Sequence, residues 1–422
     1  MLTSGQHVSL TIEKPAAGGR MIARVDGQIV LVAGGIPGER VRARIERVAK
    51  GVAYAQTVDI EDPSADRRPF DDPLCGGCLY GHIAYARQLA IKGQVIDDAF
   101  RRIGRLPLSS PVSVAASPED GYRMRARVHV RGRRLGFFRE GTHEVCDVRH
   151  TRQLLASTCE AIDRLSDGIQ SLGLDAIREI ELSENLDASE RAVFLDAAFA
   201  VDARAVARLG TTPGLTGLVS AFGSFGESHV VDRLTVADEV RITVRRHVLA
   251  FFQGNRHLLA DVVRHVVMQV PESSGALDLY AGVGLFALSA AAARGAEVTA
   301  VEGDRVAASD LASNAEAATG AVTAVHQSVE DFLRRESRER RADRSMTVIA
   351  DPPRTGMSKV ALDGVVGLRA ARLVYISCDV ATLARDARRL VEAGYVIVRV
   401  DGFDLFPNTP HVETVVVFEN RG

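Results

Sequence analysis

From residue 276 onward, the sequence alternates between short apolar runs and stretches with helical spacing, and this rhythm constrains the fold most. Predicted strands cover residues 276–280, 298–301, 322–325, 347–350 and 373–376, and predicted helices cover residues 286–294 and 306–317. Strands joined through helices build a doubly wound parallel sheet. Ligands bind such a sheet at the carboxyl ends of its strands, so the residues that follow each strand are the first candidates for a site.

Glycine and acidic residues follow the first two predicted strands. In Asp278-Leu279-Tyr280-Ala281-Gly282-Val283-Gly284, the two glycines let the backbone turn tightly beside a ligand. The third glycine of a dinucleotide fingerprint does not follow them. Glu302 ends the second strand, where a carboxylate can accept hydrogen bonds from ribose hydroxyls. These features fit a nucleoside cofactor without pyrophosphate, and S-adenosylmethionine is the commonest one.

Two further strand ends carry chemically useful side chains. Asp351-Pro352-Pro353-Arg354 follows the fourth strand, and the prolines keep the backbone extended, so we expect Asp351 at the ligand-binding edge. Cys378 lies between the strand of residues 373–376 and a predicted helix over residues 382–393. By position alone, Cys378 is either a reactive thiol at this edge or a small buried hydrophobe.

The N-terminal residues 1–60 are predicted to form a small β-barrel. Val8, Leu10 and Ile12 alternate with polar residues, and turn signals such as Asp26-Gly27 separate the apolar runs. This pattern is typical of an OB-like barrel, a frequent oligonucleotide binder, and equally of other small β-barrels or sandwiches.

Residues 61–110 are predicted to be a cysteine-bearing linker followed by one helix over residues 88–106. Cys75 and Cys78 have the spacing of two ligands in a zinc or iron–sulfur site, and also of two free thiols in a turn. Additional ligands would have to come from residues whose spacing matches no established pattern, namely Cys146, Cys159 and His82. The five cysteines fit a reducing compartment with free thiols.

Residues 111–248 are predicted to form a central α+β domain that contacts RNA. Along residues 122–130, Arg123, Arg125 and Arg127 alternate with apolar residues and share one face of a strand. An arginine-lined face can neutralise phosphates, or it can simply be solvated.

The composition and the chain start bear on the partners and the location of the protein. The net charge of −2 gives no hint of a polyanionic partner over the whole chain, so any basic surface must be local. We find no apolar run long enough to span a bilayer and no secretion signal at the start. We therefore expect a cytoplasmic protein without a membrane partner, and a monomer.

Several motifs together resemble the TRAM-domain RNA uridine C5-methyltransferases, a family that makes 5-methyluridine in 23S ribosomal RNA or tRNA. They are Asp26-Gly27, Pro37-Gly38-Glu39, Phe252-Gln253-Gly254-Asn255, residues 278–284, residues 351–356, Ser377-Cys378 with Thr382-Leu383-Ala384-Arg385-Asp386, and Asp404-Leu405-Phe406-Pro407-Asn408-Thr409-Pro410-His411-Val412-Glu413. The resemblance covers nearly the whole chain. It implies a Rossmann-like S-adenosylmethionine-dependent methyltransferase domain at residues 249–422, after a TRAM barrel and a central α+β domain.

The resemblance also implies roles for individual residues. Cys378 matches the nucleophile that attacks carbon 6 of uracil, and Glu413 matches the base that removes the proton from carbon 5. The residues expected to bind S-adenosylmethionine or shape its pocket are Gln253, Tyr280, Gly282, Gly284, Glu302 and Asp351. The residues expected to contact the RNA substrate are Arg123, Arg125, Arg127 and Arg354. Ribosomal RNA is the preferred substrate, and tRNA is the alternative.

The sequence departs from the family pattern at two places. Iron–sulfur members carry four cysteines, of which Cys75 and Cys78 match the central pair. No cysteine occurs over residues 66–74, and Thr151 occupies the last position unless Cys146 substitutes, so we expect no intact four-iron cluster. Leu285 replaces an asparagine that many relatives carry after the glycines.

Two other functions remain open at this point. A non-catalytic RNA-binding or assembly protein could retain a methyltransferase fold, although the intact Cys378 and Glu413 pair argues against it. A methyltransferase for a small molecule or protein would have little use for the barrel and the arginine strand.

Overall fold

The computed structural model describes residues 2–70, 72, 74–132, 134–339 and 345–421. Its N-terminal part is a six-stranded sheet in the order β1-β5-β6-β4-β3-β2. The strands are β1 (His7–Thr11), β2 (Lys14–Pro15), β3 (Met21–Val25), β4 (Gln28–Ala33), β5 (Arg40–Ala49) and β6 (Val52–Asp62). Alternate residues of β5, including Val41, Ala43 and Ile45, are buried, which is the period expected of a strand with one face on a core.

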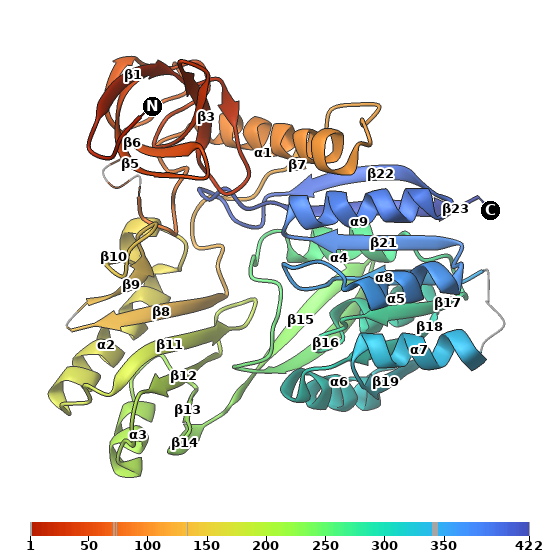
Figure 1. Cartoon of the computed structure of the whole chain (residues 1–422). Helices are drawn as coiled ribbons and strands as arrows, with labels where there is room; N and C mark the ends of the chain where they lie inside the picture. The colour runs from red at the N-terminus through yellow and green to blue at the C-terminus, as the bar shows by residue number, and fades with distance from the viewer. Residues whose placement is uncertain (1, 71, 73, 133, 340–344, 422) are drawn as a thin grey trace.

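A long helix connects this barrel to the rest of the molecule (Figure 1). Helix α1 (Tyr85–Ala99) continues into a π-helical turn, η1 (Phe100–Gly104), and a short strand, β7 (Val114–Ala115), follows. The predicted helix over residues 88–106 therefore begins earlier and ends sooner. It ends because Arg105 adopts a left-handed conformation with φ of 56°, which a right-handed helix cannot continue.

The central part is a seven-stranded sheet in the order β10-β9-β8-β11-β12-β13-β14. Its elements are β8 (Arg125–Arg131), β9 (Arg134–Phe138), β10 (Val145–Asp147), η2 (Arg149–Thr151), α2 (Ala156–Ser171), β11 (Ile177–Glu184), β12 (Arg191–Ala197), α3 (Ala203–Gly210), β13 (Gly217–Ser220) and β14 (Gly223–Gly226). Apolar residues of α2, such as Ile162 and Leu165, pack on buried strand residues such as Val128 and Ile180. A hairpin of β15 (His229–Ala237) and β16 (Val240–His247) leads into the C-terminal part.

The C-terminal part confirms the predicted alternation of strands and helices. Its elements are α4 (Leu259–Val267), β17 (Gly275–Leu279), α5 (Leu285–Arg294), β18 (Glu297–Glu302), α6 (Arg305–Ala317), β19 (Val322–His326), α7 (Val329–Glu339), β20 (Thr347–Ala350), α8 (Lys359–Leu368), β21 (Arg372–Ser377), α9 (Val380–Glu392), β22 (Tyr395–Phe403) and β23 (Glu413–Asn420). The sheet order is β19-β18-β17-β20-β21-β23-β22-β7, and β23 runs antiparallel to both of its neighbours. Because strand order reverses at β17, ligands are expected above the carboxyl ends of β17 and β20.

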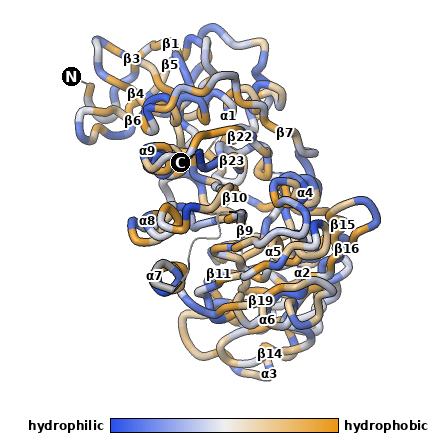
Figure 2. The backbone as a smooth tube through the Cα atoms, turned by 90° about the vertical axis from the view of Figure 1, so that its right-hand side faces the viewer, coloured by the Kyte–Doolittle hydropathy of each residue, from blue (hydrophilic) through white to orange (hydrophobic). Residues whose placement is uncertain are grey.

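Two views agree that the barrel lies at one end of the molecule, above the C-terminal sheet (Figures 1 and 2). The central sheet lies to one side of the C-terminal sheet in Figure 1. Among the helices that the structure describes, none has both the length and the apolar character needed to cross a membrane.

Candidate active site

Cys378 and Glu413 come together through the pairing of two adjacent strands. In the antiparallel ladder of β21 and β23, Ser377 lies opposite Thr414, so the next residues, Cys378 and Glu413, lie opposite each other. Side chains at opposing positions of an antiparallel pair share one face of the sheet, about 5 Å apart at Cβ. Glu413 is only 2% exposed, whereas Cys378 is half-buried.

Burial and charged neighbours both shift the pKa values of this pair. Burial and the nearby carboxylate of Glu413 raise the pKa of the Cys378 thiol to about 11, and Arg354 acts in the opposite direction. Burial also raises the pKa of Glu413 well above its usual value, and Asp351 adds to the effect. Burial therefore shifts both the thiol and the carboxyl group toward their protonated forms.

Asp351 follows β20, which is hydrogen-bonded to β21 in the sheet. Its carboxylate Oδ2 accepts a hydrogen bond from Nε2 of Gln253 at 2.9 Å. Burial raises the pKa of Asp351 to about 7, and the hydrogen bond from Gln253 opposes that rise. The structure thus brings Gln253, Asp351, Cys378 and Glu413 to the same edge of the C-terminal sheet.

The glycine loop after β17 fits a nucleoside cofactor. Glu302 at the end of β18 accepts hydrogen bonds from the backbone N–H groups of Gly282 at 2.8 Å and Asp304 at 2.6 Å. Gly282 has a φ of 56°, and a Cβ built there would meet only the Phe251 carbonyl oxygen, 3.9 Å away. The space beside the Gly282 backbone is therefore free, and the Glu302 carboxylate lies next to it. This arrangement suits the adenosine of S-adenosylmethionine.

Gly284 and Asp278 of the same motif contact α6 and α5, respectively. A Cβ at Gly284, where φ is 95°, would lie 2.7 Å from Leu311 of α6, so only glycine permits this close packing. Asp278 is buried and accepts a hydrogen bond from the Ala287 N–H group at 3.0 Å, and burial raises its pKa well above the usual value. Asp278 was not among the predicted site residues, although it lies in the glycine motif. Tyr280 lies in the loop with a φ of 61°.

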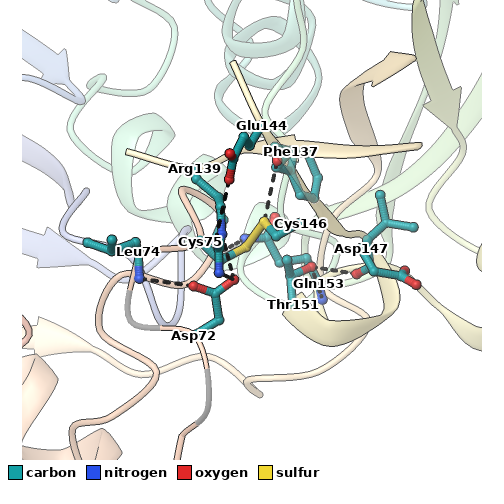
Figure 3. Close-up of a disulfide and its surroundings, with 12 residues drawn as sticks. Asp72, Leu74, Cys75, Phe137, Arg139, Glu144, Cys146, Asp147, Thr151 and Gln153 are labelled. Carbon is teal, nitrogen blue, oxygen red and sulfur yellow. Dashed lines mark hydrogen bonds and ion pairs between the residues drawn. A yellow bond between two sulfur atoms is a disulfide. The ribbon is translucent and has the colours of Figure 1, made fainter. Parts of the chain in front are cut away.

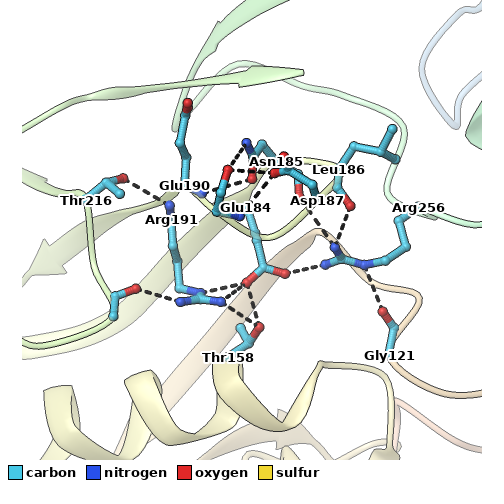
Figure 4. Close-up of polar contacts among 12 residues, drawn as sticks. Gly121, Thr158, Glu184, Asn185, Leu186, Asp187, Glu190, Arg191, Thr216 and Arg256 are labelled. Carbon is cyan, nitrogen blue, oxygen red and sulfur yellow. Dashed lines mark hydrogen bonds and ion pairs between the residues drawn. The ribbon is translucent and has the colours of Figure 1, made fainter. Parts of the chain in front are cut away.

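The segment that carries Gln253 is anchored to the central sheet. Arg256 donates hydrogen bonds to the Gly121 carbonyl at 2.9 Å and the Leu186 carbonyl at 2.8 Å, and it forms an ion pair with Glu184 (Figure 4). The Glu184 carboxylate also accepts hydrogen bonds from Arg191 and Thr158. This buried network holds the cofactor side of the site against the central domain.

The predicted arginine row is partly neutralised within the protein. Arg127, with a 60% exposed side chain, pairs with Glu181 of β11 at 2.6 Å, and Arg125 lies 3.6 Å from the same carboxylate. Arg123 donates hydrogen bonds to the Arg125 carbonyl at 2.7 Å and to Gln153 at 2.6 Å. Arg354 is exposed. Alternation in the sequence identified the shared face but did not reveal the opposing glutamate on β11.

The other four cysteines belong to the apolar cluster of the central sheet, and Figure 3 shows two of them, Cys75 and Cys146. Cys75 forms a disulfide with Cys146, so the expectation of five free thiols is wrong. The pairing arises because Cys75 bridges to Arg139 while Cys146 pairs with Phe137, which places both cysteines beside β9. Cys78 is buried, and burial raises its thiol pKa to about 12. Cys159 is also a buried free thiol.

This donor set does not fit a four-cysteine cluster. Cys75 and Cys146 bind each other, and Thr151 stands beside the loop, where its Cγ2 lies 3.0 Å from a Cβ built at Gly77. Over the described ranges, no three His, Cys, Asp or Glu side chains are grouped so as to hold a metal ion.

A cavity of about 610 Å³ lies beside the loop that follows Asp351. Tyr280, Pro353 and Met357 line it together with Arg385 and Asp386. The lining includes neither Cys378 nor Glu413, so this cavity is not the place where those two residues meet.

Comparison with known proteins agrees with this geometry. Residues 2–58 match the TRAM domain, and residues 224–421 match the family described as tRNA (Uracil-5-)-methyltransferase. The 23S rRNA (uracil(1939)-C(5))-methyltransferase RlmD of Methylococcus capsulatus is 33% identical, over 98% of this chain and 97% of that protein. RlmD of Acidithiobacillus ferrooxidans is 30% identical, over 99% of this chain and 98% of that protein.

A solved structure has the same fold over almost the whole length. It is the Pyrococcus abyssi tRNA (uracil-54, C5)-methyltransferase in complex with S-adenosyl-L-homocysteine, with a TM-score of 0.75 and 24% identity, covering 97% of this chain and 99% of that one. The chain therefore belongs to the S-adenosylmethionine-dependent RNA (uracil-C5-)-methyltransferases that carry an N-terminal TRAM domain.

Proposed function

We propose that this enzyme methylates carbon 5 of a uridine in 23S ribosomal RNA, with Cys378 as the nucleophile and Glu413 as the base. The observation that carries the proposal is the strand register that sets Cys378 opposite Glu413 at the edge where Asp351 and Gln253 also meet. The preference for ribosomal RNA rests on the names of relatives that are 30–33% identical over nearly the full chain.

The chemistry begins at carbon 6 of the uracil ring, once the base has left its stack to reach the buried edge. The Cys378 thiolate forms a bond to carbon 6, and the electron pair of the 5,6 double bond moves to give an enolate. Carbon 5 then takes a methyl group, which S-adenosylmethionine supplies when it is bound beside Gln253, Gly282, Glu302 and Asp351. Glu413 removes the proton from carbon 5, the double bond re-forms, and the Cys378 thiolate leaves.

The pKa shifts at the site are consistent with Cys378 as the nucleophile and Glu413 as the base. Arg354 opposes the rise in the Cys378 pKa, so it favours the thiolate that attacks the ring. The raised pKa of Glu413 makes its carboxylate a stronger base than an exposed glutamate. Arg123, Arg125 and Arg127 are proposed to contact the RNA backbone, with Arg127 the most exposed of the three. A monomeric state and a cytoplasmic location stay predictions.

Mapping 5-methyluridine in RNA from cells that lack the protein tests the substrate. We expect one 23S position to lose its methyl group while tRNA is unchanged. Loss from tRNA alone would favour the second candidate, a tRNA uridine, which the matching family description and the Pyrococcus abyssi structure bring forward. Normal methylation in a Cys378→Ala strain would instead favour the non-catalytic alternative.

A further inference from the structure

The loop that leads into Glu413, residues 404–412, is held mainly by parts of the chain outside the C-terminal domain. It joins β22 to β23 and reaches toward the underside of the barrel in Figure 1. Lys92 of α1 donates hydrogen bonds to Asp404 at 2.5 Å and to the Phe406 carbonyl at 3.0 Å. Both charged side chains are fully buried, so neither can exchange its partner for water.

A second anchor lies in the middle of the loop. Asn408 adopts a left-handed conformation with φ of 64°, which asparagine tolerates better than most residues other than glycine. The amide of Gln88 on α1 donates to Asn408 Oδ1 at 2.9 Å, and its oxygen accepts the Asn408 N–H at 3.0 Å. The Tyr80 N–H group donates to the Asn408 carbonyl at 2.8 Å. The segment before and within α1 therefore fixes the backbone of the loop.

The barrel and the central domain contact the same loop. A Cβ built at Gly19, in the turn before β3, would lie 2.9 Å from Cγ of Pro410. The Tyr122 hydroxyl donates to the Pro407 carbonyl at 3.2 Å. The loop leads directly into Glu413, which begins β23 opposite Phe403 of β22. Cys378 follows β21 and precedes α9, where Asp379 caps the helix through the Ala381 and Thr382 N–H groups, so the loop contacts above do not involve it.

We propose that α1 and the barrel position Glu413 for proton removal, with Lys92 and Gln88 as positioning residues and Gly19 as the barrel's point of contact. This inference rests on the proposed role of Glu413 as the base. A base acts only within hydrogen-bond reach of its proton, and small displacements slow a step greatly. Disturbing the loop should therefore leave attack by Cys378 intact and delay release of the methylated uridine from the thiol.

The barrel contact offers a matched pair of substitutions. Gly18 and Gly19 have φ values of 89° and 96°, so an added side chain strains the backbone similarly at both positions. Only Gly19 faces Pro410, whereas a Cβ at Gly18 has nothing within 4 Å. We expect Gly19→Ala to lower kcat about tenfold or more, with unchanged RNA affinity, while Gly18→Ala keeps the wild-type rate.

The diagnostic readout is the covalent intermediate. With ordinary RNA, the Gly19→Ala variant should accumulate the Cys378–uridine adduct. Replacing the hydrogen on carbon 5 with deuterium should lower the turnover rate of this variant more than that of the wild-type enzyme. Weaker RNA binding with no adduct accumulation and no added isotope effect would overturn the inference. Failure of the proposed function looks different, because the wild-type enzyme itself would then form no adduct with 5-fluorouridine RNA.

The α1 contact is tested with Lys92→Met, and Lys14→Met serves as its control. Lys14 also forms an ion pair with an α1 residue, Asp98, at 3.1 Å, but this pair is partly exposed. We expect adduct accumulation only in Lys92→Met. Because that substitution leaves Asp404 buried without its cation, it can prevent folding. Gln88→Met, which removes the hydrogen bonds of this amide to Asn408, Tyr80 and Ile83 but leaves no buried charge unpaired, provides the same readout. Unchanged adduct release in folded Gln88→Met would overturn the role of α1.

Discussion

The two cysteine sites of this enzyme differ in their surroundings more than in their thiol pKa values. Burial raises the pKa of Cys378 to about 11 and that of Cys78 to about 12. Cys378, however, lies half-buried at a sheet edge, opposite a carboxylate and beside Arg354. Cys78 lies in an apolar cluster next to the Cys75–Cys146 disulfide. The comparison shows that the two thiols differ in position, because Cys378 lies at a strand end opposite a carboxylate, whereas burial raises the pKa of both thiols.

The largest expected effect separates these two sites directly. Cys378→Ala should reduce methyl transfer by about 10⁴-fold or more, as removal of a covalent nucleophile does elsewhere. Cys78→Ala, the matched control, should stay within about threefold of the wild-type rate, because its thiol is buried in the apolar cluster of the central sheet and not at the edge where Cys378 lies opposite Glu413. Initial rates with labelled methyl donor measure both, and comparable losses would contradict the comparison.

Replacing the opposing carboxylate should have the next largest effect. Glu413→Gln keeps the shape of the side chain but cannot accept the carbon 5 proton, so turnover should fall about 10²- to 10⁴-fold. The Cys378 adduct should persist, because the thiolate cannot leave until that proton is gone. Gel electrophoresis under denaturing conditions detects the adduct, and fast turnover would argue against Glu413 as the base.

Removing Arg354 should shift the pH dependence. The guanidinium lowers the pKa of Cys378, so Arg354→Met should raise that pKa further above about 11. Less thiolate then exists at neutral pH, with about a tenfold loss of rate per pKa unit. The methylation rate should still rise with pH, but the rising limb of the pH–rate profile should move to higher pH. Arg127→Met serves as the control. An unchanged pH–rate profile in Arg354→Met would exclude a role of Arg354 in lowering the Cys378 pKa.

The smallest effect on catalysis is expected at the disulfide. Cys146→Ser removes a link across 71 residues and should lower the free energy of unfolding by about 2–4 kcal/mol, while the methylation rate of the folded protein stays nearly unchanged. Urea unfolding with and without reductant measures the change. A large loss of rate in the folded variant would mean that the two cysteine sites are coupled.

Much of the fold was predictable, because alternating apolar strands and helices leave few topologies for residues after 276. Cys378 and Asp351 were predictable for the same reason, since they follow parallel strands that end at one edge. The adjacency of Glu413 could be proposed only from family resemblance. It depends on β23 inserting antiparallel between β21 and β22, an order that no local pattern encodes.

The missed features depend on contacts between distant segments. Neither the Cys75–Cys146 disulfide nor the pairing of Arg127 with Glu181 follows from residue spacing, because both arise from strand neighbours. Lys92 resembled any other charged helix residue until the structure placed it against Asp404.

The most direct test of the account is trapping with RNA that contains 5-fluorouridine at the target position, followed by mass spectrometry of the digested protein. Fluorine on carbon 5 cannot leave as a proton does, so elimination stops after methyl transfer. The proposed mechanism predicts a methylated fluorouridine nucleotide attached to Cys378 of the wild-type enzyme and none on the Cys378→Ala variant. An adduct on another cysteine, or methylated product released without any adduct, would contradict it.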